Sequence, residues 1–402
     1  MMSLTMTNRA IELSLAPGTH RAIGLMSGTS HDGISAAIVA IDETKSPPVR
    51  LIAFHSYPYP PAFRARLLRA SGGDGVGTDE ISTLNFELGR AFGRAAIAIS
   101  RRARIPLARL SFVGSHGHTM FHRPPRTAAR GQTPSTLQLG ESALIAAMTG
   151  LPVAADFRPM DMALGGEGAP LAPLAHLWMF RDRKLGRVVQ NIGGIANATY
   201  VPASGRRVIA FDTGPGVMLI DALAAKLSNG RLRMDRGGRM AARGTVSEAM
   251  LADLMRNAYF RRRPPKSTGR EQFGADYLER IEAHARRLAI GGDDLIATLT
   301  ALTARSIADA CRRFVMPLGR VDQLIATGGG ARNPTLVRML RQELRAIEVT
   351  TADQIGIDGD ALEAVAFAIL GYQMLRGKPG NVPSVTGARA PAILGKLTMP
   401  PR

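Results

Sequence analysis

Apolar and turn-forming residues alternate near the start of the chain in a pattern typical of two strands joined by a tight turn. Residues 21–26 (RAIGLM) and 34–42 (ISAAIVAID) are largely apolar, and the small residues SGTSHDG lie between them. A related pattern returns at residues 187–201, where RVVQN and IANATYV flank IGG, and the apolar run VIAF follows. Two related openings predict two halves of similar architecture.

Helical and extended patterns alternate through the rest of the chain. The apolar period predicts helices over residues 79–104 and 295–314, and the run SFVGSHG (111–117) predicts a buried strand that ends in a glycine turn. A strand, QLIATGGG, follows at 323–330, and an Ala-rich helix over 360–375 should return to the first half. This alternation predicts an α/β protein with mixed sheets that are parallel in part.

Length and composition support two domains. The chain has 402 residues, of which 45% are apolar, and this is too much for one ordinary domain. The one cysteine, Cys311, cannot form an internal disulfide, so a reducing compartment is expected, with a functional thiol as the alternative. We find neither a secretory signal pattern nor an apolar run of about 18 residues, which predicts a cytoplasmic protein without a membrane partner.

The chain is strongly basic, with 51 Lys and Arg against 32 Asp and Glu and a net charge of +19. Such a charge could indicate nucleic-acid binding. Basic residues are spread along the whole chain, however, and they do not alternate with the aromatic residues that a single-strand binder needs for stacking. We therefore expect no specific nucleic-acid partner but a solvated surface that attracts anionic metabolites.

The turn segment GLMSGTSHDG is a candidate phosphate-binding site. Successive backbone N–H groups between two strands can cradle phosphate oxygens, and Asp32 is suited to hold Mg²⁺ through water. The alternative is an ordinary hairpin turn, in which Asp and Gly are simply turn formers.

Two later segments have a similar character. In FDTGPG (211–216), Asp212 ends an apolar strand ahead of a helix, a place where ligands bind in α/β folds and where anions are favoured. In ATGGGARN (326–333), three glycines permit close approach by a nucleotide. Either segment alone could be a simple turn. We find neither the Walker pattern nor a GxGxxG that opens a helix.

Three histidines, His116, His118 and His122, alternate along one predicted strand and could in principle ligate zinc. The run lacks a nearby acid or thiolate as fourth ligand, and a glycine interrupts it. Contact with a substrate, or packing, is the favoured interpretation.

The chain closely resembles the anhydro-N-acetylmuramic acid kinase family. The resemblance runs from about Ile23 to Gly395 and rests on long, non-repetitive strings: GLMSGTSHDG, GSHGHT, DFRPMDMALGGEGAPL, NIGGIAN, FDTGPG, PKSTGRE, GGGARNP and DALEAVAFAIL. It implies a two-domain actin/hexokinase-like (ribonuclease H-like) fold with mixed sheets flanking a central cleft. We expect an N-terminal-half domain of residues 21–130 plus 365–402, a C-terminal-half domain of residues 131–364, and a poorly ordered leader over residues 1–20.

The resemblance also implies an activity: conversion of 1,6-anhydro-N-acetylmuramic acid, ATP and water into N-acetylmuramic acid 6-phosphate and ADP during cell-wall recycling. Asp212 would be the catalytic base and Glu363 would assist at the sugar. Ser27, His116 and Arg158 would bind substrate, with Arg158 opposite the lactyl carboxylate; a salt bridge from Arg158 to Asp156 or Asp161 is the alternative. Mg²⁺ and ATP are the expected cofactors, and a homodimer is possible. The ATP-binding set would be Gly28, Thr29, Ser30, His31, Asp32, Gly33, Ile34, Ser35, Gly214, Gly216, Gly328, Gly329, Gly330 and Asn333.

Four positions depart from the pattern of that family. The family usually has an apolar residue at His31, an acid at Ser35, Gln at His118 and Asn at Val217. These departures bear on nucleotide affinity and on the choice of anhydrosugar. The competing functions are a hexose or glycerol kinase on the same fold, against which DFR and KSTGRE argue, and a nucleotide-switched chaperone or filament subunit, for which the chain lacks a peptide-binding domain.

Overall fold

The computed structural model describes residues 15, 18–28, 31–72 and 75–401, which form two compact units. Unit 1 combines the chain up to Met179 with the chain from Ala361 onward, and unit 2 is the continuous segment Phe180–Asp360. Most of the predicted leader lies outside the described residues. The expected boundary after residue 130 differs from this division, because the strands that follow residue 130 pair with the sheet of unit 1.

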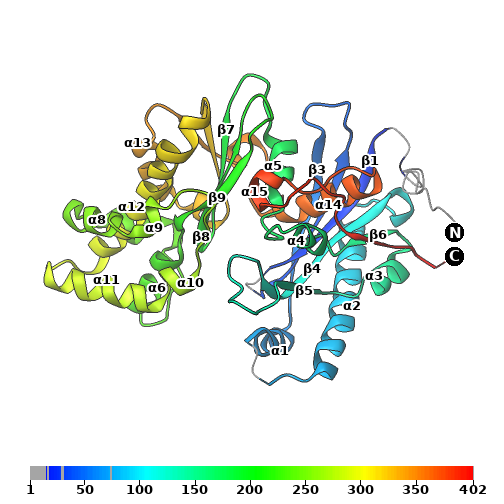
Figure 1. Ribbon diagram of the computed structural model, residues 1–402. Coiled ribbons are helices and arrows are strands. Elements are labelled where there is room, and N and C mark those ends of the chain that lie inside the picture. Colours follow the sequence, from blue (N-terminus) through cyan, green and yellow to red (C-terminus); the bar gives the residue numbers. More distant parts are fainter. Residues whose placement is uncertain (1–14, 16–17, 29–30, 73–74, 402) are drawn as a thin grey trace. The chain divides into compact units, whose positions relative to one another are not determined.

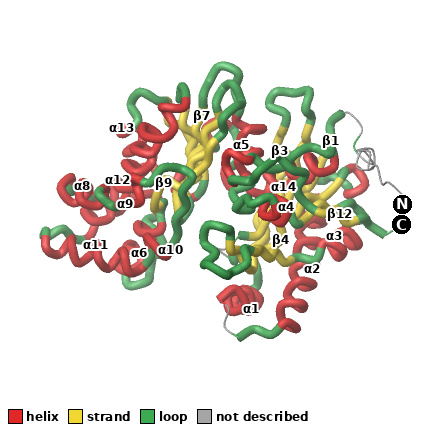
Figure 2. Tube along the Cα trace, in the orientation of Figure 1, coloured by secondary structure: helices red, strands yellow, loops and turns green. Residues whose placement is uncertain are grey.

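Unit 1 is built on a seven-stranded sheet (Figures 1 and 2). Its strands are β1 (His20–Ser27), β2 (Gly33–Ile41), β3 (Val49–Pro58), β4 (Phe112–Arg123), β5 (Ser135–Leu139), β6 (Val153–Ala155) and β12 (Lys396–Thr398). Its helices are α1 (Pro61–Gly72), α2 (Thr78–Arg102), α3 (Ser142–Thr149), α4 (Arg158–Ala163), α14 (Leu362–Leu375) and α15 (Pro383–Thr386), and α5 (Ala172–Phe180) ends at the boundary with unit 2.

The two faces of this sheet are covered by helices that lie far apart in the sequence. On β1, Ile23 and Leu25 belong to the apolar cluster that includes α2, whereas Ala22 belongs to the cluster that includes α14. Successive strand residues point to opposite faces, so one strand serves both layers. α14 can approach closely because Gly24 has no side chain: a Cβ there would lie 1.8 Å from the carbonyl oxygen of Ala364.

Unit 2 has a five-stranded sheet with helices packed on it (Figure 1). Its strands are β7 (Arg187–Ile192), β8 (Ile195–Val201), β9 (Ile209–Pro215), β10 (Gln323–Thr327) and β11 (Glu348–Thr351). Its helices are α6 (Met218–Leu227), α7 (Arg239–Arg243), α8 (Glu248–Met255), α9 (Ala258–Arg261), α10 (Arg270–Phe273), α11 (Ala275–Arg287), α12 (Gly292–Ala310) and α13 (Pro334–Glu343). One apolar cluster joins the sheet to α6, α12 and α13.

The two sheets share one strand order. Unit 1 has the order β3-β2-β1-β4-β6 and unit 2 has the order β9-β8-β7-β10-β11. In each, the first three strands in sequence form an antiparallel meander, and the next two continue the sheet in parallel. The predicted α/β class and the repeated two-half architecture of the actin/hexokinase-like fold are therefore confirmed.

Two of the predicted elements end differently from expectation. β4 does not stop at a glycine turn, because Gly117 takes a positive φ of 75° within the strand and β5 continues the pairing as far as Arg123. The long helix predicted over 295–314 begins at Gly292 and gives way after Ala310 to a wider π-helical turn, Cys311–Val315.

Cys311 lies in the core of unit 2 and is fully buried. Burial raises the pKa of its thiol to about 12, so it stays protonated and unreactive. Within the described residues, each helix is too short or too polar to cross a membrane.

Candidate functional site

The predicted phosphate turn joins β1 to β2, and unit 1 holds its second half firmly. Thr29 and Ser30 lie outside the described residues. His31 adopts φ 55°, and its N–H donates to the carbonyl of Gly28 (3.1 Å). Arg64 of α1 donates to the carbonyl of His31 (3.1 Å) and forms an ion pair with Asp32 (3.2 Å). The Asp32 side chain is 72% exposed, so it can still reach water and a ligand.

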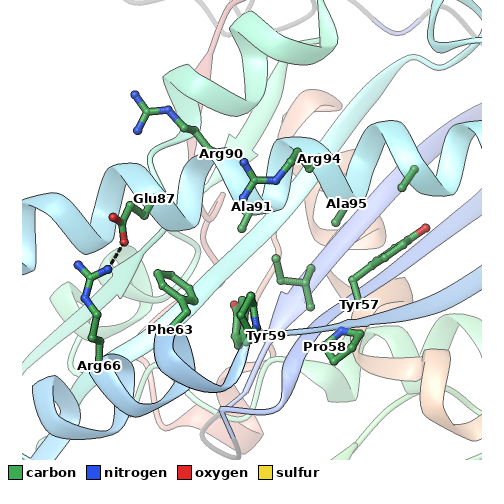
Figure 3. A pocket seen from close by; sticks show the side chains of 13 residues that line it. Tyr57, Pro58, Tyr59, Phe63, Arg66, Glu87, Arg90, Ala91, Arg94 and Ala95 are labelled. Carbon is green, nitrogen blue, oxygen red and sulfur yellow. Dashed lines mark hydrogen bonds and ion pairs between the residues drawn. The ribbon is translucent and has the colours of Figure 1, made fainter.

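Beyond the turn, the side chains of Ile34 and Ser35 contact other parts of unit 1. The Ile34 side chain is buried, at 2% exposure, and lines a cavity of about 560 Å³ between α1, α2 and the end of β3 (Figure 3). The side chain of Ile34 is therefore directed into this cavity, while its main chain belongs to the β2–β3 ladder opposite Tyr57. The Ser35 hydroxyl lies 3.4 Å from that of Ser56 on β3. In Figure 3 the α2 residues Arg90 and Arg94 lie across the cavity from Tyr59.

Four side chains form a buried hydrogen-bonded chain behind the turn. Tyr59 donates its hydroxyl to Ser27 Oγ (2.9 Å), which lies 2.9 Å from His118 Nδ1. The other ring nitrogen of His118, Nε2, lies 3.0 Å from His31 Nδ1. Two of the positions that depart from the family pattern, His31 and His118, thus contact each other. Burial lowers the pKa of His118 to about 4 and also lowers that of His31, so both rings are neutral at pH 7.

The predicted substrate residues of unit 1 also meet. His116 is 2% exposed and its Nδ1 faces the carbonyl of Gly117 (3.1 Å), so Nδ1 carries the proton. Its Nε2 therefore accepts the hydrogen bond from Arg158 Nε (3.0 Å). Burial and the charge of Arg158 hold the pKa of His116 well below its usual value. The neutral imidazole of His116 thus orients the guanidinium of Arg158 through Nε. The two terminal nitrogens of the guanidinium can then face a ligand.

Glu363, at the start of α14, is the acid near this guanidinium. Desolvation raises the pKa of Glu363 even though solvent reaches its side chain, and the charge of Arg158 opposes that rise. Burial lowers the pKa of Arg158 to about 10, which still leaves it charged at pH 7.

The alternative salt bridges of Arg158 are not formed among the described residues. Asp156 pairs instead with Lys396 (2.8 Å), and Asp161 accepts hydrogen bonds from Asn381, Thr386 and the N–H of Gly168. A shared zinc site is also unsupported, since within the described chain no three His, Cys, Asp or Glu side chains are placed to hold a metal ion.

In unit 2, Asp212 lies in the middle of β9 and is half-buried. The prediction that it ends the strand is wrong, because β9 continues to Pro215 and pairs with β8 over its whole length. One carboxylate oxygen accepts a hydrogen bond from the N–H of Thr268 (2.9 Å). Burial raises the pKa of Asp212 to about 6, while this N–H and Lys266 lower it and Glu271 raises it further. A carboxylate with a pKa close to neutrality is suited to take a proton and release it.

The remaining predicted residues of unit 2 frame the ends of β9 and β10. Gly216 must be glycine, because a Cβ there would lie 2.0 Å from the carbonyl oxygen of Gly193, and its neighbour Gly214 lies within β9. Gly328 directly follows β10, and Gly329 and Gly330 open the next turn. Asn333 caps α13 by accepting from the N–H of Leu336 (3.0 Å), so its oxygen already has a structural role.

The sequence analysis missed the contacts that surround Asp212. Lys266 and Thr268 belong to the PKSTGRE string, which marked the resemblance but was given no role, and Tyr259 lies outside every string that we singled out. The Tyr259 hydroxyl donates to the carbonyl of Asp212 (2.7 Å). No local signal connects this segment with Asp212, because Thr268 lies 56 positions away from it along the chain.

Comparisons with known proteins bear on the family of the chain. The family model described as anhydro-N-acetylmuramic acid kinase matches residues 20–400. A protein of that name from Coxiella burnetii is 43% identical over 94% of this chain and 97% of its own length. Another, from Caldanaerobacter subterraneus subsp. tengcongensis, is 40% identical over 94% of this chain and 96% of its own. Among solved structures, component A of the Acidaminococcus fermentans (R)-2-hydroxyglutaryl-CoA dehydratase covers 89% of this chain and 99% of its own at 13% identity, with a TM-score of 0.44. On the family model and the two sequence relatives, the chain belongs to the anhydro-N-acetylmuramic acid kinase family.

Proposed function

We propose that this chain opens 1,6-anhydro-N-acetylmuramic acid with water and transfers the γ-phosphoryl group of ATP to the freed 6-oxygen. The products are N-acetylmuramic acid 6-phosphate and ADP. The observation that carries the proposal is Asp212, a half-buried carboxylate held within β9 with its pKa raised to about 6, in a member of this kinase family.

Asp212 acts as the general base. Water is a poor nucleophile at neutral pH, so a carboxylate must take its proton as it attacks the anomeric carbon. The new bond forms between the water oxygen and that carbon, and the bond from the carbon to the bridging 6-oxygen breaks. The 6-oxygen then attacks the γ-phosphorus, and the bond to the ADP oxygen breaks.

The residues of unit 1 bind and orient the sugar. Arg158, fixed through its Nε by His116, presents its remaining N–H groups to the lactyl carboxylate, a geometry that favours a bidentate contact. Glu363 assists at the sugar, close enough to Arg158 for the two charges to affect each other. Ser27 contributes a hydroxyl that Tyr59 and His118 hold in place.

The predicted glycine turns would bind ATP, and Asp32 would hold Mg²⁺ through water. Mg²⁺ keeps several waters and takes one or two carboxylates together with the phosphates, so an exposed single carboxylate such as Asp32 suits it. The ion supplies neutralisation of charge on the transferring phosphoryl group. Arg64 pairs with Asp32 and keeps that carboxylate beside the turn.

The test is ADP release from Mg²⁺-ATP with 1,6-anhydro-N-acetylmuramic acid, measured against a panel of free sugars. We expect ADP release with the anhydrosugar and none with the free sugars of the panel. In ¹⁸O-labelled water, the label should appear in the anomeric hydroxyl and be absent from the phosphate. Equal turnover of glucose or free N-acetylmuramic acid, or label in the phosphoryl group, would overturn the proposal.

Three further properties belong to the proposal. The enzyme is cytoplasmic, it forms a homodimer, and any binding to DNA is weak and disappears steeply with salt because it depends on counterion release. Sedimentation velocity tests the dimer. Sequence-selective DNA binding at physiological salt would contradict the last point.

A further inference from the structure

One short segment of unit 2, residues 259–268, contacts Asp212 on three sides. The Tyr259 hydroxyl donates to the Asp212 carbonyl (2.7 Å), and the Asp212 N–H donates to the Lys266 carbonyl (3.1 Å). The third contact is the hydrogen bond from the N–H of Thr268 to the carboxylate (2.9 Å). Main chain and side chain of Asp212 are therefore both fixed by this segment.

The side chain of Lys266 is enclosed by aromatic rings. The residue is 8% exposed, and its Nζ lies 4.6 Å from the centre of the Tyr259 ring, 4.9 Å from Phe314 and 5.8 Å from Phe211. Nζ also donates to the carbonyl of Tyr259 (3.3 Å). Ring faces attract a cation, but they replace water only in part.

Burial lowers the pKa of Lys266 to about 8, and Arg313 and Arg262 add to that effect, while Asp309 and Asp212 oppose it. At pH 7 the group is still mostly charged. An apolar side chain in this place would avoid the desolvation cost of a buried charge. A cation kept at such a cost beside a candidate base points to a role in function.

We propose that Lys266 and Tyr259 are positioning residues for Asp212. Tyr259 fixes the main chain of Asp212 within β9, and the Lys266 ammonium stabilises the ionised carboxylate so that it remains a base near neutral pH. This inference rests on the proposed function, because it concerns the residue assigned there as the base.

The sign of the expected effect follows from the charges. Burial and Glu271 disfavour the Asp212 anion, and Lys266 favours it. Replacing Lys266 with Met keeps an unbranched side chain that is shorter by the ammonium group and removes the charge, so the pKa of Asp212 should rise, by about one pH unit. The base would then be protonated at a higher pH, and kcat/KM should fall roughly five- to tenfold at pH 5.5 and change little at pH 8.

The experiment titrates the Asp212 carboxyl directly by ¹³C NMR in Asp-labelled protein, with D212N identifying its resonance. We compare wild type, K266M and K226M. Lys226 is the matched control, an exposed lysine of the same unit paired with Glu282. K266M should raise the midpoint of the Asp212 titration, and its melting temperature should equal or exceed that of wild type. The control K226M should change neither the Asp212 midpoint nor the pH profile of kcat/KM.

A second pair of variants tests Tyr259. Y259F removes only the hydroxyl, and kcat should fall about tenfold with little change in KM. Y200F is its control, because the hydroxyl of Tyr200 also donates to a backbone carbonyl, that of Arg320 (3.1 Å), and Tyr200 is likewise buried. Y200F should match Y259F in stability and keep the wild-type kcat.

The outcomes separate the two proposals. An unchanged Asp212 midpoint in K266M, or equal kcat in Y259F and Y200F, would overturn the inference while leaving the anhydrosugar kinase intact. Wild-type protein without anhydrosugar kinase activity would defeat the proposed function, yet the carboxyl titration would still report whether Lys266 acts on Asp212. A lowered melting temperature in K266M without a shifted midpoint would make Lys266 a structural residue only.

Discussion

Each unit pairs a carboxylate with a desolvated cation, and the two pairs are built differently. In unit 1, Arg158 is held by a single hydrogen bond from its Nε to a neutral histidine, close to Glu363. In unit 2, Lys266 is enclosed by three rings and a backbone carbonyl, close to Asp212.

The difference lies in what each cation leaves available. A guanidinium has five N–H donors, so Arg158 can be fixed by one and still bind an external carboxylate with others. An ammonium enclosed as Lys266 is has little left to offer a ligand, and its charge acts instead on the neighbouring acid. Under the proposed function, the cation of unit 1 would recognise the substrate and the cation of unit 2 would tune the base.

The largest expected effect comes from D212N, which keeps the shape of the unit 2 acid and removes its basicity. Turnover should fall by roughly 10²–10⁴ with substrate binding largely kept. Steady-state kinetics and calorimetric titration with the anhydrosugar measure the two quantities. Turnover near that of wild type would show that another group takes the proton from water.

A smaller effect, and of another kind, is expected from R158K in unit 1. Lysine keeps the charge but has no planar fork, so KM for 1,6-anhydro-N-acetylmuramic acid should rise roughly ten- to a hundredfold while kcat changes little. The control substrate is 1,6-anhydro-N-acetylglucosamine, which lacks the lactyl carboxylate and should be turned over alike by both enzymes. An equal loss with both substrates would mean that Arg158 serves the structure of unit 1 and not recognition.

The smallest effect concerns stability and the histidine contact behind the turn. His118 has a pKa of about 4 in the folded chain against an ordinary value of 6.5, so the unfolded state binds its proton first as the pH falls. Its contribution to stability is therefore fully present above about pH 6.5 and is lost towards pH 4. The glutamine side chain of H118Q does not titrate. Between pH 7.5 and pH 5 the melting temperature of H118Q should therefore fall by a few degrees less than that of wild type. Parallel curves for the two proteins would contradict this account.

Local sequence patterns predicted the strands and turns that carry these pairs. The strand, turn and strand at the start of each half, the position of Asp212 on a strand beside a glycine turn, and the long helix α2 are all confirmed. The predicted family is confirmed as well, since its marks are strings of adjacent residues. Adjacent residues report their own period and turn chemistry, so such features can be predicted without knowing the partners of a strand.

The partners themselves could not be predicted. His31 meets His118 across 87 positions of the chain, and Tyr259 meets Asp212 across 47. The ring cage of Lys266 draws on Phe211 and Phe314, which no local pattern connects. The predicted unit boundary differs from the observed one for the same reason: β5 and β6 are short, and their pairing with distant strands places them in unit 1, β5 with β4 and β6 with β4 and β12.

The return of α14 to unit 1 has a consequence for how the chain is made. Unit 2 is continuous, so the ribosome synthesises it as one uninterrupted segment. The sheet of unit 1 cannot pack against α14 until synthesis has passed residue 375. Until then the apolar face that includes Ala22, Val39 and Phe112 lacks its cover. Nascent chains with such a face are open to aggregation and are typical clients of chaperones. A product terminated near residue 360 would carry a whole second unit and an unfinished first one, so the segment that follows unit 2 decides whether the segment that precedes it completes its fold.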